Sequence, residues 1–263
     1  MSDSLAVSVL GIGLAGPGLA GWQRSRDVLR DASRWNRAPT ELAAPLLLQP
    51  AERRRAGAMV KLSLAVADEA SAGIDRQRLA TVFSASTGES ANCHALCETL
   101  ATPERLVSPT RFTNSVHNAG AGYWHIATQS RARSTSLCGR DASFGAGLLE
   151  AAVQCVTGGE PVLLVASDVP YPEPLHGSRP LPDAFGVALL LGARADDNVP
   201  RLEVRLIDAP ATPCDDAGLE ALRTAIPAAR SLPLLAALAR RASARLVIEY
   251  LGPPQLEVRV TGA

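Results

Sequence analysis

The sequence has 263 residues, of which 47% are apolar and 20% are charged, and its 26 Lys and Arg balance its 26 Asp and Glu. A neutral chain lacks the excess positive charge that nucleic-acid binding requires, so we expect no nucleic-acid partner. No run approaches the ~18–20 consecutive apolar residues of a membrane span, and no basic segment precedes the apolar run near the N-terminus. Five cysteines, an odd number, are typical of reduced thiols, and we expect a cytoplasmic protein.

The first half of the chain alternates between strand and helix patterns. In chain order we predict a strand (5–14), a helix (20–32), a loop (36–50), a helix (50–72), a strand (79–86), a helix (89–101), a loop (106–116) and a helix (118–129). The helix over 50–72 has the clearest pattern, because Pro50 suits a first turn and apolar residues recur at helical spacing. Gly73 is expected to end this helix.

The second half continues the alternation. We predict a strand (133–138), a helix (143–157), a strand (161–168), a proline-rich loop (170–182), two strands (184–193 and 201–208), helical material (214–242) and two final strands (244–250 and 255–260). The continuous apolar run over 161–168 is typical of a strand covered on both faces. Alternating strands and helices predict an α/β sandwich. The one seam lies near 195–200, and we predict a single domain over 1–263.

A glycine motif follows the first predicted strand, where Gly11, Gly13 and Gly16 satisfy G-x-G-x-x-G. A dinucleotide site needs a helix that opens at these glycines and an acidic residue ~20 positions later, at the end of the next strand. Pro17-Gly18 interrupts the start of such a helix, and that offset falls inside a predicted helix. We therefore predict a tight turn and no cofactor.

Cys93, His94 and Cys97 form a second cluster, on the predicted helix 89–101. A metal site needs three or four convergent ligands, and no C-x-x-C partner occurs elsewhere in the sequence. We predict no metal site, and thiols that pack against the body of the protein.

The segment from Ser136 to Gly147, SLCGRDASFGAG, predicts a strand that runs through a sharp turn directly into a helix. Such a bend exposes one side chain and places helix amides where an oxyanion could bind. Ser143, Asp168 and His176 occur in the chain order of a hydrolase triad, which keeps a hydrolase as one alternative. His176 comes only eight positions after Asp168, however, and a hydrolase fold needs more chain between them.

The same region resembles the β-ketoacyl synthases of the thiolase superfamily. In that family a loop of the type SPxxxxNSxxNxAG leads to a helix, a strand delivers TAC[AS][ST]G, and the next helix ends in EA. This sequence has SPTRFTNSVHNAGAGYWHI and then STSLCGRDASFGAGLLEAAVQCVTGGEPVLLVASD. Four further segments resemble the family, so that the match covers residues 5–193: GIGLAGPG, RRRAGAMVKLSLAVADEASAGI, FSASTGES and DAFGVALLLGA.

The resemblance implies a thiolase-like layered sandwich, mainly the N-terminal half-fold, with a mixed sheet flanked by helices. Residues 194–263 form a divergent C-terminal part. Counting back without gaps from Glu150 places Asp141 on the family's catalytic cysteine. A carboxylate is a poor acyl acceptor and opposes a developing oxyanion. The family's two catalytic histidines also have no counterpart, because only His176 follows Asp141.

Two further interpretations concern this bend. If the alignment slips by one turn, Cys138 becomes the nucleophile; it lies three residues upstream, where we expect it to be buried in the strand and protonated. Alternatively, the Asp141 side chain caps the helix that follows it. An enzyme that acts on acyl thioesters through Cys138 or Ser143 therefore remains an alternative.

Members of the family that lack the cysteine are chain length factors, which pair with an active ketosynthase. The sequence is similar to the small members found in aryl polyene and polyketide gene sets. The resemblance implies a non-catalytic subunit with an active ketosynthase as its partner, an acyl carrier protein as an indirect partner, and a homodimer as another state. Phe112, Thr113 and Val116 are the candidates to line or cap the partner's tunnel, although Phe112 could instead pack in this protein's own core.

Overall fold

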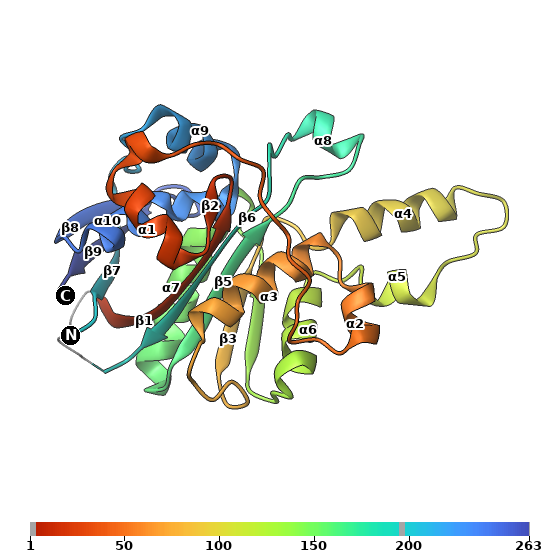
Figure 1. Ribbon diagram of the computed structural model, residues 1–263, viewed down its shortest axis with the longest axis horizontal. Coiled ribbons are helices and arrows are strands. Elements are labelled where there is room, and N and C mark those ends of the chain that lie inside the picture. The colour runs from red at the N-terminus through yellow and green to blue at the C-terminus, as the bar shows by residue number, and fades with distance from the viewer. Residues whose placement is uncertain (1–3, 195–197, 263) are drawn as a thin grey trace.

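The computed structural model describes residues 4–194 and 198–262, and its strands join into one mixed sheet (Figure 1). The strands are β1 (Leu5–Gly16), β2 (Leu19–Ala20), β3 (Ala80–Ser84), β4 (Ser134–Leu137), β5 (Val162–Asp168), β6 (Phe185–Gly192), β7 (Arg201–Ile207), β8 (Ala244–Ile248) and β9 (Gln255–Thr261). Their order across the sheet is β4-β3-β5-β6-β1-β7-β9-β8, with β2 paired to the end of β1. Only β4, β3 and β5 run parallel to one another, and the other neighbouring pairs are antiparallel.

Helices cover both faces of this sheet. The α-helices are α1 (Trp22–Arg30), α2 (Pro50–Arg55), α3 (Ala58–Ala70), α4 (Ser90–Leu100), α5 (Pro109–Thr113), α6 (Ala119–Thr128), α7 (Ser143–Gly158), α8 (Leu175–Ser178), α9 (Ala217–Ala225) and α10 (Leu232–Arg240). On one face α3 and α6 pack against Leu163 and Val165 of β5, and on the other α7, α1 and α10 share a core with Leu164. The fully buried β5 confirms the strand expected to be covered on both faces. The predicted α/β fold, a mixed sheet flanked by helices, is thereby confirmed.

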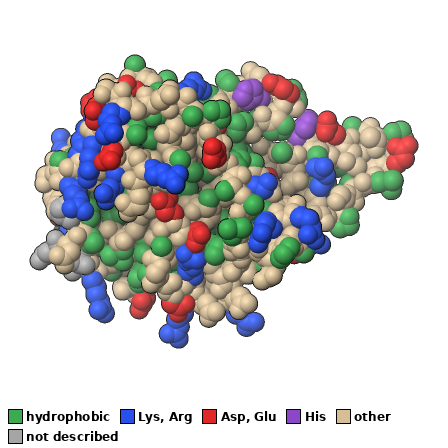
Figure 2. Space-filling model, in the orientation of Figure 1, with side chains coloured by type: hydrophobic (Ala, Val, Ile, Leu, Met, Phe, Trp, Pro, Cys, Tyr) green, Lys and Arg blue, Asp and Glu red, His purple; other side chains and the backbone are tan. Residues whose placement is uncertain are grey.

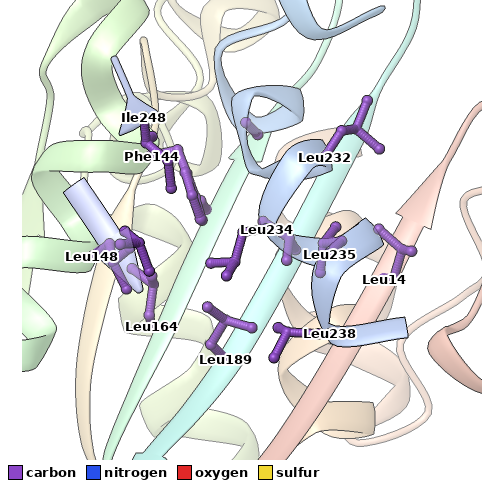
Figure 3. Packing of buried hydrophobic residues seen from close by; sticks show 14 of the residues in the cluster. Leu14, Phe144, Leu148, Leu164, Leu189, Leu232, Leu234, Leu235, Leu238 and Ile248 are labelled. Carbon is purple, nitrogen blue, oxygen red and sulfur yellow. The ribbon is translucent and has the colours of Figure 1, made fainter. Parts of the chain in front are cut away.

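The larger hydrophobic core joins the two parts of the chain (Figure 3). Leu234 and Leu235 of α10 point toward Leu189 of β6 and Leu14 of β1. Phe144 of α7 packs in the same core as Ile248 at the end of β8. The described residues from 198 to 262 thus contribute to the core of the segment that precedes them. This shared core supports the single-domain organisation, which stays a prediction; residues 195–197 of the expected seam lie outside the described residues.

The helix expected over 50–72 is two helices. The chain breaks at Gly57, the N-cap of α3, because the carboxylate of Glu89 accepts a hydrogen bond from the Val60 amide (3.1 Å). A Cβ at position 57 would overlap that carboxylate, so any larger residue there would displace the Glu89 side chain. The second helix ends at Ala70 with Ser71 as its C-cap, and Gly73 adopts a positive φ of 82° two residues after the cap. The apolar periodicity could not reveal this break, since a side chain remote in sequence causes it.

Two segments predicted as loops contain short helices. Ser108 accepts a hydrogen bond from the Arg111 amide and so begins α5, within the loop expected over 106–116. Likewise, α8 forms one turn within the loop expected over 170–182. In each case the helix is too short to produce a periodic apolar pattern.

The glycine motif has a different role from the predicted tight turn. Gly11 and Gly13 lie inside β1, where a Cβ would overlap the carbonyl oxygens of Ala70 and Val66 on α3. The glycines therefore allow α3 to lie directly against the strand. The turn itself is formed by the next two residues, Pro17-Gly18, which connect β1 to β2. No helix opens at these glycines, as a dinucleotide site would require.

The thiols of Cys93 and Cys97 are exposed on α4, whereas the sequence predicted that they would be packed. The structure differs because α4 projects from the body of the molecule (Figure 1). Between them His94 lies 3.3 Å from Glu98. Residues 4–194 and 198–262 contain no cluster of three or more His, Cys, Asp or Glu side chains that could hold a metal ion. No helix in those ranges is long and apolar enough to cross a lipid bilayer.

Candidate functional site

The bend between β4 and α7 lies at the carboxyl edge of the three parallel strands β3, β4 and β5. A short 3₁₀ turn, Arg140–Ala142, connects the strand to the helix, and Arg140 has a left-handed φ of 53°. The Ser143 hydroxyl accepts a hydrogen bond from the Gly139 amide (3.1 Å) and donates one to the Arg140 carbonyl (2.7 Å). These local bonds fix the bend, and they compensate for a backbone conformation that non-glycine residues rarely adopt.

Asp141 points outward from this bend and is held by an ion pair. Its side chain is 55% exposed, and its Oδ1 accepts a hydrogen bond from Nη2 of Arg179 (2.5 Å). The Arg179 guanidinium also lies over the ring of Tyr171, 5.9 Å from its centroid. The carboxylate makes no capping bond to α7, so the predicted capping role is wrong. Arg179 comes from the proline-rich segment 38 residues downstream, and no local pattern in the sequence indicates this pairing.

Cys138 lies one residue beyond the end of β4, and its thiol is exposed. The structure thus corrects the expectation that it is buried in the strand. The thiol contacts the backbone carbonyl oxygen of Ser86 (3.2 Å). A carbonyl oxygen accepts a hydrogen bond but does not remove the proton, so this contact does not produce the thiolate that acyl transfer requires.

The three residues of the hydrolase alternative do not bond to one another. Ser143 is buried, and its hydroxyl takes part in the bonds that fix the bend. His176 lies in α8, and its buried Nδ1 has no hydrogen-bond partner among the described residues. Asp168 accepts backbone N–H groups from Ser86 and Ala228, both at 2.8 Å. No hydrogen bond among the described residues joins these three side chains into a triad.

Asp168 has the pKa that departs most from its ordinary value at this edge of the sheet. It is fully buried at the end of β5, and burial raises the pKa of its carboxyl to about 6, although the hydrogen bonds from Ser86 and Ala228 oppose that rise. Its neighbour Ser86 shares a second hydrogen bond with the Tyr171 hydroxyl (2.8 Å). We call the connected group the carboxyl-edge cluster; its members are Ser86, Cys138, Asp141, Asp168, Tyr171 and Arg179. An acidic residue at the end of a long apolar run was the one sequence signal for it.

Two of the candidate tunnel residues, Phe112 and Thr113, lie on a separate feature, a projecting arm, and Val116 lies just beyond its end. We define the arm as residues 90–113, which comprise α4, the loop 101–108 and α5 (Figure 1). Phe112 on α5 is 68% exposed, and Thr113 and Val116 are also exposed. The structure therefore excludes the interpretation that Phe112 packs in this protein's own core. Leu100 and Leu106 add to the exposed apolar surface of the arm, and the sequence motifs did not indicate them.

Next to the arm, the body of the protein offers little space for a ligand. A cavity of about 20 Å³ lies at the end of β3, lined by Met59, Ser63 and Phe83 among others. That volume holds about one water molecule. The Ser63 and Ser167 hydroxyls share a hydrogen bond (2.7 Å) beside it. A growing acyl chain would therefore need space outside this cavity.

The outer side of β4 is a free edge of the sheet. β4 is the first strand in the sheet order and pairs only with β3 in the described residues. Its other side thus presents unpaired backbone groups, which in natural proteins are covered or matched with another chain. The bend follows directly from this strand.

Residues 22–248 match the protein family described as "Beta-ketoacyl synthase, N-terminal domain". No curated protein matches the chain. The fold is similar to a chain of the ketosynthase ApeO in complex with its chain length factor ApeC from Xenorhabdus doucetiae, with a TM-score of 0.75 and 21% identity over 98% of this chain and 99% of that one.

Two further structures share the fold at lower identity. A chain of the AntDE:AntF complex, described as a type II PKS acyl-carrier protein with its ketosynthase bound to the hexaketide, has a TM-score of 0.73 and 11% identity over 99% of this chain and 100% of that one. A β-ketoacyl synthase from Burkholderia phymatum STM815 has a TM-score of 0.56 and 12% identity over 90% of this chain and 71% of its own. The protein belongs to the β-ketoacyl synthase N-terminal domain family.

Proposed function

We propose that this protein is a non-catalytic, chain-length-factor-like subunit that pairs with an active β-ketoacyl synthase in aryl polyene, polyketide or fatty-acid-type synthesis. The observation that carries the proposal is the carboxylate at the bend. Asp141, which the motif order predicts to align with the family's nucleophile, is held by Arg179 in an ion pair. Similarity to complexes of a ketosynthase with a chain length factor and with an acyl-carrier protein supports this choice of partner.

The chemistry of condensation explains why this bend favours a non-catalytic role. A condensing enzyme needs a thiolate to carry the acyl chain, and groups that stabilise negative charge on the reacting thioester. A carboxylate at the bend is a weak nucleophile, and its charge opposes an oxyanion at the start of α7. The sequence has four histidines, of which three precede the bend, and the fourth, His176, lies in α8.

The surface next to the bend suits the proposed partner. The free edge of β4 can pair with a strand of another chain, and Phe112 on the arm and Val116 just beyond it add exposed apolar side chains. The cavity at the end of β3 is too small for an acyl chain, so the tunnel would lie mainly in the ketosynthase. In that arrangement Phe112, Thr113 and Val116 cap or line the tunnel, and the acyl carrier protein delivers its chain to the ketosynthase subunit. We expect the pair to act in the cytoplasm.

The test is co-expression with a ketosynthase from the same gene neighbourhood. We expect the two chains to purify together, and Phe112→Ala to lengthen or scatter the products, because the side chain would no longer block the tunnel. Mass spectrometry of the acyl products measures this effect. Leu206→Ala is a matched control, since Leu206 is also exposed but lies on β7, on the far side of the sheet from β4.

Two outcomes would contradict separate parts of the proposal. If the chains do not form a complex, the pairing is wrong, and size-exclusion chromatography of this protein alone then tests the homodimer. If the complex forms and product length is the same with Phe112→Ala as with Leu206→Ala, the capping role of the arm is wrong.

An enzyme that acts on acyl thioesters remains the second candidate, because the exposed Cys138 thiol lies at the bend. It predicts that label from an acyl thioester is transferred to the protein and that Cys138→Ser abolishes the transfer. The hydrolase form predicts turnover of p-nitrophenyl esters that is lost in Ser143→Ala. Our proposal predicts neither activity in the isolated protein.

A further inference from the structure

We propose that the outer face of β7, β9 and β8 docks an acidic helix of a partner protein, in which two carboxylates one turn apart bind Arg245 and Arg259. We call this surface the arginine face, and its charged members are Arg201, Glu203, Arg205, Arg245, Glu257 and Arg259. The three strands form the end of the sheet opposite to β4. The inference is therefore independent of the proposed pairing with a ketosynthase.

The register of the strands places these charged side chains on one face of the sheet. Leu202, Val204 and Val258 belong to the larger core, so the residues that alternate with them point to the opposite face. On that face α3 packs against β1, β5 and β6, and the described hydrophobic clusters around α3 contain no residue of β7, β8 or β9. The side chains of Arg245 and Arg259 accordingly remain 57% and 47% exposed. This end of the sheet thus presents a charged face that α3 leaves open.

Glu257, at the centre of the face, orients three guanidinium groups. Its buried carboxylate accepts hydrogen bonds from Nε of Arg205 (2.7 Å) and Arg259 (3.0 Å), and also from Nε of Arg245. Hydrogen bonds from Arg205 and Arg245 lower the pKa of Glu257 to about 2, although burial opposes the shift, so the group is charged at neutral pH. The shared carboxylate holds the arginines in place before any partner binds, which reduces the entropy lost on binding.

The acids of the face do not balance its arginines. Four arginines stand against Glu203 and Glu257. Arg245 and Arg259 are direct partners across the β8–β9 pair, where like charges repel, and their Nη groups have no acceptor within the described chain. Although the whole protein is neutral, Figure 2 shows several Lys and Arg side chains gathered on the side of the molecule where β8 and β9 lie in Figure 1. Carboxylates of a partner would relieve this repulsion.

The shape of the face favours a helix over a small ligand. The depression beside Glu257 has a volume of about 140 Å³, below the roughly 300–1,000 Å³ of small-molecule sites. Opposite residues on antiparallel strands have Cα atoms about 4.5–5.5 Å apart, and residues i and i+4 of a helix have Cβ atoms about 5–6 Å apart. Two Glu side chains one turn apart can therefore reach Arg245 and Arg259 together. Each carboxylate would accept two parallel hydrogen bonds from one guanidinium group.

The test is fluorescence anisotropy with the full-length protein and a labelled, alanine-based helical peptide that carries Glu pairs at i and i+4. A second peptide has the same composition but places the paired Glu residues at i and i+2, which do not share a helix face. A third peptide has Gln in place of Glu. At one ionic strength we expect saturable binding of the first peptide, binding of the second that is about fivefold weaker or more, and none of the third.

Substitutions on the face should act on the same binding. Arg245→Gln and Arg259→Gln should each weaken binding of the first peptide by about fivefold or more, because each removes charge-assisted hydrogen bonds. Arg245→Lys, which keeps the charge but loses the planar fork, should bind with intermediate affinity. Arg78→Gln is the matched control, since Arg78 is also exposed but lies just before β3, toward the other end of the sheet. It should change affinity by less than about twofold, because its charge is distant and screened.

Three results would overturn the inference. The first is the absence of saturable binding of the i and i+4 peptide. The second is an equal loss of affinity in Arg78→Gln and Arg259→Gln, which indicates diffuse attraction. The third is binding to phosphatidylglycerol vesicles without binding to the peptide, which assigns the face to a membrane surface. Arg259→Gln should still purify together with the ketosynthase, since β4 lies at the opposite edge of the sheet.

Discussion

At the carboxyl edge of the sheet, Asp168 is buried and both its carboxylate oxygens accept backbone N–H groups, whereas Leu106 at the tip of the arm is 81% exposed. The carboxyl-edge cluster binds its polar groups to one another: Asp141 to Arg179, and Ser86 to Tyr171. The arm exposes apolar side chains to solvent. The bend and the carboxyl-edge cluster thus form a closed region, in the sense that their polar groups bind one another, while the arm exposes apolar surface of the kind that often marks an interaction site.

The largest effect is expected from a substitution that disrupts the close packing of α7 next to the bend. Gly145, in the first turn of α7, packs against the backbone of the segment after β8, and a Cβ there would overlap the Glu249 carbonyl. Gly145→Ala should lower the free energy of unfolding by about 3 kcal/mol or more, because backbone on both sides must move. Urea denaturation followed by circular dichroism measures this.

The control is a second helical glycine on the arm side of the molecule. A methyl group added at Gly122 in α6 would meet no atom of a neighbouring element within 4 Å. Gly122→Ala should raise stability by roughly 0.5–1 kcal/mol, since alanine restricts the unfolded chain and favours helix. Equal effects of the two substitutions would contradict the close packing of the C-terminal part against α7.

The second effect is a pH dependence that belongs to the closed region. Because the pKa of Asp168 rises from 3.8 to about 6 on folding, the folded state binds more protons than the unfolded state between these values. The contribution of this group to stability should therefore fall as pH rises from 4 to 6, by up to roughly 3 kcal/mol, and stay constant above that.

Asp168→Asn removes this titration, so the difference in unfolding free energy between wild type and variant should change with pH across that window. Asp208→Asn, which alters an exposed carboxyl after β7, is the control; its unfolding free energy should depend on pH in the same way as that of the wild type. If the unfolding free energies of wild type and Asp168→Asn differ by the same amount at every pH, burial does not raise the pKa of the Asp168 carboxyl.

A third, smaller effect concerns the ion pair at the bend. About half of the Asp141 side chain is exposed, so the pair with Arg179 should contribute only about 0.5–1 kcal/mol. A double-mutant cycle with Asp141→Asn and Arg179→Gln should give a coupling energy in this range that declines in high salt. A coupling energy of zero at low salt would mean that the proline-rich segment is not fastened to the bend.

The smallest effect is expected in the arm. Leu106→Ser should change the free energy of unfolding by less than about 0.5 kcal/mol, because the side chain buries almost nothing in this chain. A clear loss of stability in the isolated protein would show that the arm folds back on the body or associates with a second copy. Sedimentation analysis of the same variant distinguishes those two cases.

The sequence by itself determined most of the secondary structure and the family. Continuous apolar runs located β5 and β6, and helical periodicity located α6 and α7, because these patterns reflect burial of a local face. The motif order around the bend also predicted a thiolase-like mixed sheet, and placed Asp141 at the family's nucleophile position, an assignment that stays a prediction.

Only the tertiary structure decided which side chains meet. The break before α3 depends on Glu89, the fastening of the bend depends on Arg179, and the closeness of α3 to β1 depends on Gly11 and Gly13. Each of these contacts joins residues far apart in the chain, so no local pattern records them. The projection of the arm is a further example: the sequence left open whether Phe112 lines a partner's tunnel or packs in the core, and only the position of the arm outside the body shows that the side chain is exposed.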